Sequence, residues 1–317
     1  MATKNVDLVV QGGGVKGIAA LGAILPLYDA GYRFHRIAGT SAGAIVAALV
    51  AAYQRAGEDL HKLEPVMREM EYAAFKDDTV LERVAGNVGR GIELLLHDGM
   101  YSGDYLYEWL EPLLQAVGVT TFGDLRLDDP DGSMYEYQAY SLVVAATDLS
   151  RQVLVRLPWD YDQYDQPAGE QRIVDAVRAS MSYPFFFRPY QFTTGKGDQV
   201  TWVDGGLLAN FPVTLFDRND GRAPRWPTWA VRISATPPFV DKPITSALGE
   251  AKGMIDTFLS VSNNQYHLDD EGIGRRTIAV DTTEVSSMDF GMTREQAQLL
   301  FDRGLAAGKA FLDKMNG

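Results

Sequence analysis

The sequence predicts an α/β protein built on a mainly parallel central sheet, and the pattern of its first 60 residues carries that prediction. Short apolar runs at Val6–Val10 and Phe34–Ala38 are typical of buried strands. Each is followed by a stretch with apolar side chains at helical spacing, at Gly17–Ala30 and Ala42–Ala56, and each stretch ends at a glycine. Strands and helices that alternate over short connections form parallel sheets covered by helices.

The rest of the chain adds further strands and helices. Strands are expected at Ala139–Ala146, Val153–Leu157, Val200–Val203, Ala230–Ser234 and Thr277–Val280. Helices are expected at Gln171–Met181 and Thr293–Lys314. The segment Asp59–Gln115 is mainly helical and mixed in polarity, which is typical of a cap that keeps water away from a reacting site. Without repeats or long linkers, we expect one domain over residues 1–317, with a motif-bearing core at 6–215 and an extension at 216–317.

Composition excludes several classes of function. The chain has 317 residues and a net charge of −13, which disfavours binding to nucleic acid. It contains no cysteine, so disulfides, thiolate metal sites and cysteine nucleophiles are excluded. The N-terminal segment Met1–Asp7 has no long apolar run, and the uncharged stretch Ile37–Gln54 is interpreted as a buried helix. We therefore expect a soluble, cytoplasmic protein.

The first chemical motif is Gly39-Thr40-Ser41-Ala42-Gly43, which follows a predicted strand and opens a predicted helix. A G-x-S-x-G sequence in that context forms a sharp turn that presents the serine hydroxyl, and the helix N-terminus favours a nearby anion. By itself the pattern is equally compatible with a turn in which Ser41 only caps the helix.

The second motif is Gly12-Gly13-Gly14-Val15-Lys16-Gly17, directly after the first strand. Consecutive glycines let backbone N–H groups point into one concavity, which suits the oxyanion of an acyl-transfer intermediate. Lys16 either adds charge there or holds the loop.

The same loop also matches the G-x-G-x-x-G pattern of dinucleotide sites, so a nucleotide-binding protein is an alternative. Such a site needs an acidic residue at the end of the next strand, and Phe34–Ala38 runs into the serine turn instead. The phosphate-loop pattern also fails, because Lys16 is followed by glycine.

The third motif is Asp204-Gly205-Gly206, after a predicted strand. A carboxylate at a strand end, followed by glycines that allow close backbone approach, can act as a base. A Ser41–Asp204 dyad needs no histidine. The alternative is a Ser41–His267 hydrolase of the α/β-hydrolase type, which is disfavoured because only one strand precedes the serine. The other histidines are His35, His61 and His97.

These three motifs, in this order, resemble those of the patatin-like phospholipase family, the bacterial-type patatin acyl hydrolases. Three shorter segments add to the resemblance, which covers residues 6–215: Thr121–Leu125, Ala146–Leu149 and Ala179–Pro189. The aromatic run Tyr183–Phe187 suggests an acyl-chain site, although a packed core cluster is the preferred interpretation.

The resemblance implies a three-layer α/β/α fold and a lipid acyl hydrolase of the phospholipase A, lysophospholipase or esterase type. Ser41 would form an acyl-enzyme, the Gly12–Val15 amides would hold the oxyanion, and Asp204 would act as base. The resemblance implies no metal or organic cofactor. The partners it implies are a lipid or phospholipid substrate, peripheral contact with a membrane and, in some relatives, a small-molecule activator.

Overall fold

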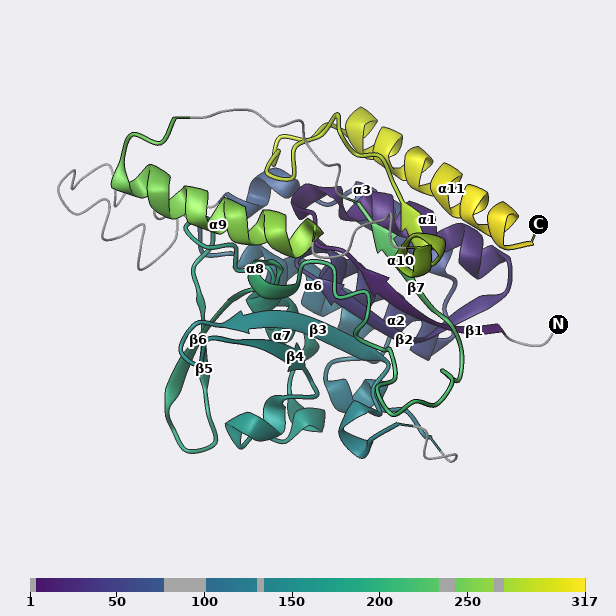
Figure 1. The fold of residues 1–317 in the computed structure, drawn as a ribbon, viewed down its shortest axis with the longest axis horizontal. Coiled ribbons are helices and arrows are strands. Elements are labelled where there is room, and N and C mark those ends of the chain that lie inside the picture. The colour runs from purple at the N-terminus through teal and green to yellow at the C-terminus, as the bar shows by residue number, and fades with distance from the viewer. Residues whose placement is uncertain (1–3, 77–100, 130–133, 234–242, 265–270, 317) are drawn as a thin grey trace.

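The computed structural model describes residues 4–76, 101–129, 134–233, 243–264 and 271–316 (Figure 1). Its strands are β1 Lys4–Val10, β2 Tyr32–Thr40, β3 Leu142–Asp148, β4 Val153–Leu157, β5 Tyr190–Thr193, β6 Gln199–Asp204, β7 Thr228–Arg232 and β8 Thr277–Ala279. Its helices are α1 Gly17–Asp29, α2 Ala42–Ala56, α3 Leu63–Arg68, α6 Tyr105–Ala116, α7 Ile173–Ser180, α8 Gly206–Ala209, α9 Ala247–Asn264, α10 Glu271–Arg275 and α11 Arg294–Asn316.

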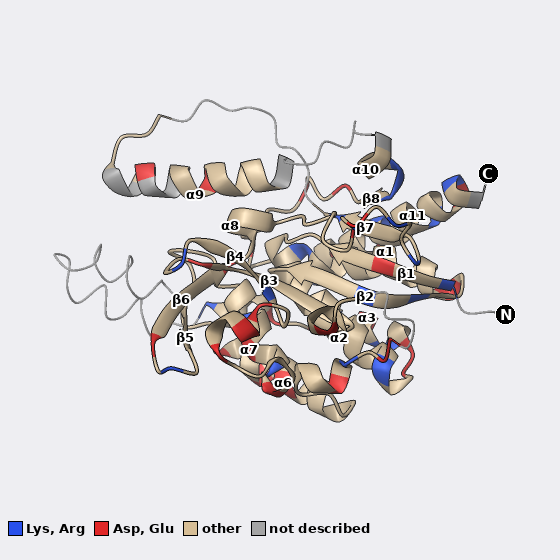
Figure 2. Cartoon of the chain, turned by 60° about the horizontal axis from the view of Figure 1, so that its bottom comes forward, with Lys and Arg blue, Asp and Glu red and all other residues tan. Residues whose placement is uncertain are grey.

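The strands form one sheet in the order β5-β6-β3-β2-β1-β7-β8, with β4 also paired to β3. From β3 to β8 the pairings along this path are parallel. The pairings of β4, β5 and β6 are antiparallel, so the predicted parallel core carries an antiparallel part. Helices lie on both sides of the sheet, with α6 and α7 on one side and α8 and α9 on the other (Figure 2).

The register of β3 brings two strands together end to end. Ala145 pairs with Thr40 of β2, and Ala146 pairs with Asp204 of β6, while β4 pairs with both alanines. A strand has only two edges, so β4 occupies one and β2 and β6 share the other. Since β2 runs parallel to β3 and β6 runs antiparallel, their C-terminal ends meet head on beside Ala145 and Ala146.

The last third of the chain completes the same sheet. β7 pairs in parallel with β1, and β8 pairs in parallel with β7. In Figure 1 the C-terminal helix α11 packs along α1, next to the N-terminal strand. The division into domains stays a prediction, but residues 216–317 extend the sheet that carries the first two motifs.

Several predicted boundaries were wrong. The strand expected at 139–146 is β3 at 142–148, because Glu136–Gln138 forms a short 3₁₀ helix and Ala139 continues its turn. β5 and α8 were not predicted, since four-residue elements are too short to show a period. Only the end of α9 was expected, as part of a polar helical stretch at 260–271, of which residues 265–270 lie outside the described residues. The uncharged stretch 37–54 forms the end of β2 and most of α2, and α2 is buried on nearly all sides.

The described part of the predicted cap is helical and contributes to the core. It contains α3, a 3₁₀ helix at Tyr72–Phe75 and α6, whereas residues 77–100 lie outside the described residues. None of the helices in the described ranges is both long and apolar enough to cross a bilayer.

Helices α1 and α11 pack unusually closely, because glycines line their contact. A Cβ atom at Gly304 would lie 2.2 Å from the carbonyl oxygen of Ala19. A Cβ atom at Gly22 would lie 2.3 Å from the carbonyl oxygen of Phe301. Both neighbours are backbone atoms of the facing helix, so neither can move without displacing the helix itself.

We expect Gly304→Ala to lower the free energy of unfolding by about 1–3 kcal/mol through overpacking. Alanine is the better helix former by about 1 kcal/mol, so propensity alone predicts the opposite sign. Urea denaturation measures the difference. Lys309→Ala, at an exposed position of α11, is the control and should change little. A more stable Gly304→Ala variant would show that the two helices are not in close contact.

Candidate active site

Ser41 lies at the junction between β2 and α2. Its φ is +53°, an unusual backbone conformation for a residue with a side chain, and its side chain is partly exposed. A Cβ atom at Gly39 would lie 2.2 Å from the Gly43 carbonyl oxygen, and one at Gly43 would lie 2.4 Å from that of Val10. These two positions admit only glycine, which explains the spacing of the first motif.

A buried serine that the sequence did not single out holds this turn in place. The Ser41 backbone N–H donates to Oγ of Ser180 at 2.8 Å, and the Ser180 hydroxyl donates to the Ala145 carbonyl oxygen at 2.6 Å. Ser180 is fully buried at the C-terminal end of α7. The strained turn is therefore fastened to β3 at the point where β2 and β6 meet.

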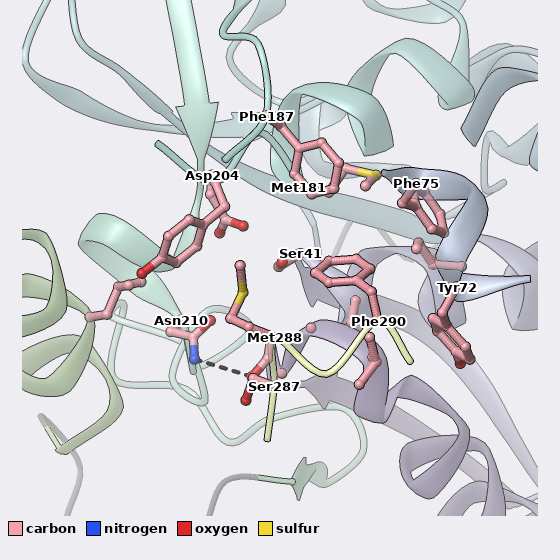
Figure 3. A pocket seen from close by; sticks show the side chains of 18 of the residues that line it. Ser41, Tyr72, Phe75, Met181, Phe187, Asp204, Asn210, Ser287, Met288 and Phe290 are labelled. Carbon is pink, nitrogen blue, oxygen red and sulfur yellow. Dashed lines mark hydrogen bonds between the residues drawn. The ribbon is translucent and has the colours of Figure 1, made fainter. Parts of the chain in front are cut away.

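Asp204, at the end of β6, faces Ser41 across this junction (Figure 3). The residue is 3% exposed, and no Lys or Arg in the described ranges forms an ion pair with it. Burial raises the pKa of Asp204 to about 6, and the bond from the Gly206 N–H and the Ser41 hydroxyl both oppose that rise. The N–H of Gly206 donates to Oδ1 at 2.7 Å, while Gly205 packs against the Ala145 carbonyl.

The glycine-rich loop lies beside Ser41, but only part of it is free to bind. The N–H of Gly12 donates to the Asn210 carbonyl at 3.1 Å, and that of Val15 donates to the Ser287 carbonyl at 3.1 Å. Gly13 and Gly14 line the same cavity as Ser41, and their N–H groups have no partner within the described ranges. Of the predicted amides, these two are therefore the candidates for an oxyanion site.

Lys16 holds the loop, and its side chain does not line the cavity. It is 6% exposed, and Nζ donates to Oγ1 of Thr282 at 3.3 Å. Burial lowers the pKa of Lys16, and Asp281 opposes that effect. Gly17 is the first residue of α1 and likewise does not line the cavity.

Asn210 connects the second and third motifs, and sequence analysis missed it. Its backbone carbonyl accepts from the Gly12 N–H, and its side chain donates from Nδ2 to the Gly12 carbonyl at 3.2 Å. Its own N–H donates to Oγ of Ser262 in α9. The only sequence signal was its position six residues after Asp204, at the end of α8.

Ser41 and Asp204 open into a cavity of about 220 Å³ whose walls are mostly apolar (Figure 3). Side chains from five separate parts of the chain form those walls, namely Ile45, Met70, Tyr72, Phe75, Met181, Tyr183, Phe187, Leu259, Met288 and Phe290. The aromatic run Tyr183–Phe187, which is expected from the sequence to pack as a core cluster, therefore also lines this cavity. Phe187 is buried in the core, and Tyr183 is half-buried beside the cavity.

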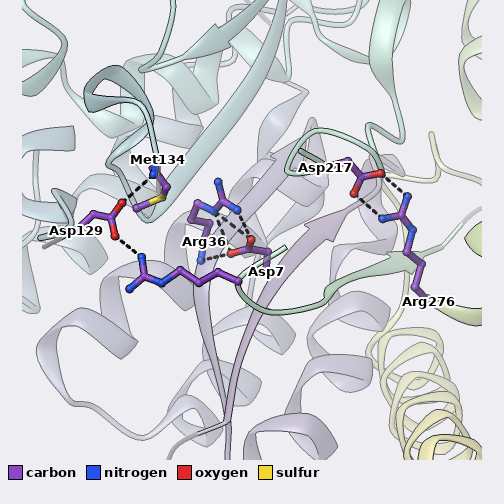
Figure 4. Close-up of polar contacts among 7 residues, drawn as sticks. Asp7, Arg36, Asp129, Met134, Asp217 and Arg276 are labelled. Atoms are coloured by element: carbon purple, nitrogen blue, oxygen red, sulfur yellow. Dashed lines mark hydrogen bonds and ion pairs between the residues drawn. The ribbon is translucent and has the colours of Figure 1, made fainter. Parts of the chain in front are cut away.

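A second cavity, of about 490 Å³, is larger and polar, but it contains no candidate catalytic residue. Carboxylates hold its arginines, as Asp7 holds Arg36 and Asp129 holds Arg225 (Figure 4). Burial raises the pKa of Asp7, and Arg36 opposes that rise. These ion pairs are sufficiently explained as structural contacts.

The histidines do not supply a base to Ser41 in the described ranges. His35 stacks on Trp226 with ring centroids 4.0 Å apart, and burial lowers its pKa to about 4. His61 bonds to Asp29 at the surface. His97 and His267 lie outside the described residues, so the alternative that uses His267 is untested. Within those ranges, no group of acidic and histidine side chains is arranged to hold a metal.

Comparison with known proteins places the chain in a family. The sequence profile of the patatin-like phospholipases matches residues 8–217. The chain belongs to this family, which is a family of lipid hydrolases. It is similar to YqhO of Bacillus subtilis (strain 168), at 31% identity over 97% of this chain and 98% of that protein.

Two further similarities agree with this placement. An Escherichia coli protein named cUMP-AMP-activated phospholipase is 27% identical over 66% of this chain and 56% of its own length. The crystal structure of VipD from Legionella pneumophila matches with a TM-score of 0.54 at 18% identity, covering 98% of this chain and 67% of that one. The similarity to VipD supports the predicted three-layer α/β/α fold.

We expect Ser180→Ala to slow the reaction of Ser41 with a fluorophosphonate by roughly 10- to 100-fold, because the turn loses its anchor. Labelling rates followed by mass spectrometry measure this. Ser182→Ala is the matched control, since Ser182 is equally buried but bonds to Arg178 instead of the turn. Both variants should lose about 1–3 kcal/mol of stability. Equal labelling of the two would mean that Ser180 does not position Ser41.

We also expect Asp204→Asn to stabilise the fold at neutral pH. The raised pKa means that the folded state prefers the neutral carboxyl, so stability is lost as the pH rises from about 4 through about 6. Asparagine avoids that loss, which amounts to about 3 kcal/mol at pH 8 and vanishes near pH 4. Denaturation from pH 4 to 8 tests this, with Asp302→Asn on the surface of α11 as the control. A constant difference across that range would contradict the buried charge.

Proposed function

We propose that this protein hydrolyses acyl esters of lipids with Ser41 as nucleophile and Asp204 as general base. The observation that carries the proposal is the meeting of β2 and β6, which brings a partly exposed serine and a buried carboxylate to one apolar cavity. A pKa of about 6 suits a base that works near neutral pH.

The acylation step follows from this arrangement. Oγ of Ser41 attacks the ester carbonyl carbon while its proton passes to the carboxylate of Asp204. The carbonyl oxygen becomes an oxyanion, which the N–H groups of Gly13 and Gly14 stabilise. The intermediate then expels the alcohol, which takes the proton from Asp204 and leaves an acyl-Ser41.

The second step regenerates the enzyme. Water loses a proton to Asp204 and attacks the acyl carbon, and the same two amides hold the second oxyanion. Collapse of that intermediate breaks the bond to Ser41 Oγ, which recovers the proton, and releases the fatty acid. The apolar walls stabilise the acyl chain and exclude bulk water.

The nucleotide-binding alternative has less support. Two of the loop amides that a phosphate needs, those of Gly12 and Val15, are already bonded to backbone carbonyls. No acidic side chain stands at the end of β2 to bind a ribose. The glycine loop is better suited to one small anion beside Ser41.

We expect Ser41→Ala and Asp204→Asn each to lower ester hydrolysis by at least about 1,000-fold while the fold persists. Release of p-nitrophenol from a short-chain ester, and of fatty acid from phosphatidylcholine, are the measurements. In the wild type, kcat/KM should rise with pH to a plateau with a midpoint near 6, because only ionised Asp204 accepts a proton.

Assays should be run with and without cUMP-AMP, because a relative's name states that this compound activates it. Asp302→Asn serves as the control and should keep full activity. Full activity in Asp204→Asn would overturn the dyad and direct attention to His267. An inactive wild type under both conditions would overturn the proposed function.

A further inference from the structure

Exposed apolar side chains gather along one side of α9. Met254, Phe258 and Val261 are 56%, 55% and 63% exposed. Their spacing of four and three residues places them on one face of the helix. Ile244, which is 61% exposed, lies beside Gly253 of the same helix, because a Cβ atom at Gly253 would lie 3.1 Å from its Cδ1.

The opposite side of the same helix belongs to the candidate active site. Leu259 lines the cavity that contains Ser41, and Ser262 is buried against Asn210. Asp256 accepts a hydrogen bond from the Tyr183 hydroxyl at 3.0 Å, which ties α9 to the cavity wall. The helix therefore has the catalytic cavity on one side and its apolar stripe toward solvent on the other.

The charges of this region indicate what can cover the stripe. Figure 2 shows two acidic positions on α9, Glu250 and Asp256, and the sequence of the helix also contains one lysine, Lys252. The whole chain carries a net charge of −13. This net charge disfavours an anionic lipid surface, whereas it does not repel a zwitterionic or neutral one.

We propose that the stripe Met254, Phe258 and Val261 docks on a zwitterionic or neutral lipid surface. The helix then lies in the plane of the interface with its apolar face in the lipid. Because a helix is about 10–12 Å across, docking brings the cavity within that distance of the substrate's own phase. This inference rests on the proposed function, since it assigns the surface from which the same site takes its substrate.

The test uses the triple variant Met254→Ser/Phe258→Ser/Val261→Ser. Co-sedimentation with phosphatidylcholine vesicles should weaken by roughly 10-fold or more, because three apolar side chains no longer enter the lipid. Hydrolysis of vesicle phosphatidylcholine should fall in parallel. Hydrolysis of a soluble p-nitrophenyl ester should stay within about 2-fold of wild type, since none of the three residues lines the cavity.

The matched control is Leu299→Ser/Met315→Ser on α11, at positions 37% and 47% exposed. It should bind vesicles as the wild type does. Vesicles of phosphatidylglycerol should bind the wild type more weakly than phosphatidylcholine vesicles do, and the difference should shrink at high salt.

The outcomes separate this proposal from the proposed function. Vesicle binding that depends on the stripe, in a protein that cleaves no ester, supports docking and overturns the hydrolase. Ester cleavage by a wild type that does not bind vesicles, or equal binding by wild type and triple variant, overturns docking and leaves the hydrolase standing. If the variant turns a dimer into a monomer and vesicle binding is unchanged, the stripe is a contact between copies and docking is also overturned.

Discussion

The candidate site depends on one constraint, the sharing of a single edge of β3 by two strands that run toward each other. Backbone pairing at Ala145 and Ala146 fixes where β2 stops and where β6 stops, and hence where Ser41 and Asp204 meet. The Ser180 hydroxyl then joins the Ser41 N–H to the Ala145 carbonyl. Neither Ser41 nor Asp204 has to create this geometry, because ladder hydrogen bonds in a buried sheet already impose it.

A second constraint, the anchoring of the glycine-rich loop, explains why the last third of the chain matters. Among the residues that the structure describes, the N–H groups of Gly13 and Gly14 have no partner, while the rest of their loop is held in place: Val15 by the Ser287 carbonyl, and Lys16 by Thr282. Both partners follow β8, which joins the sheet through β7. A loop of consecutive glycines has high conformational entropy, so fixing it requires contacts from outside the loop. Residues 216–317 supply those contacts.

Sequence analysis predicted the part of the site that local chemistry dictates, and missed the part that tertiary contacts dictate. The glycines around Ser41 and the carboxylate of Asp204 stand in patterns tied to a strand end, so they could be found without a structure. Ser180 and Asn210 are ordinary polar residues whose importance comes from partners more than 130 positions away in the chain. Lys16 is a further example of what the sequence cannot decide. Adding charge and holding the loop both fitted the sequence, and only the bond from Lys16 to Thr282 favours the second role.

Asp204 is buried, no basic side chain of the described segments pairs with it, and this burial has two opposite consequences. Desolvation raises its pKa and so weakens the folded state wherever the carboxylate is ionised. The same desolvation makes the carboxylate a stronger proton acceptor than an exposed aspartate, which a dyad without histidine requires. A neighbouring arginine would restore stability, but it would also lower the pKa and weaken the base. Under the proposed function, the apolar walls would serve the acyl chain and the base together, and the stability lost at Asp204 would be the physical cost of catalysis without an imidazole.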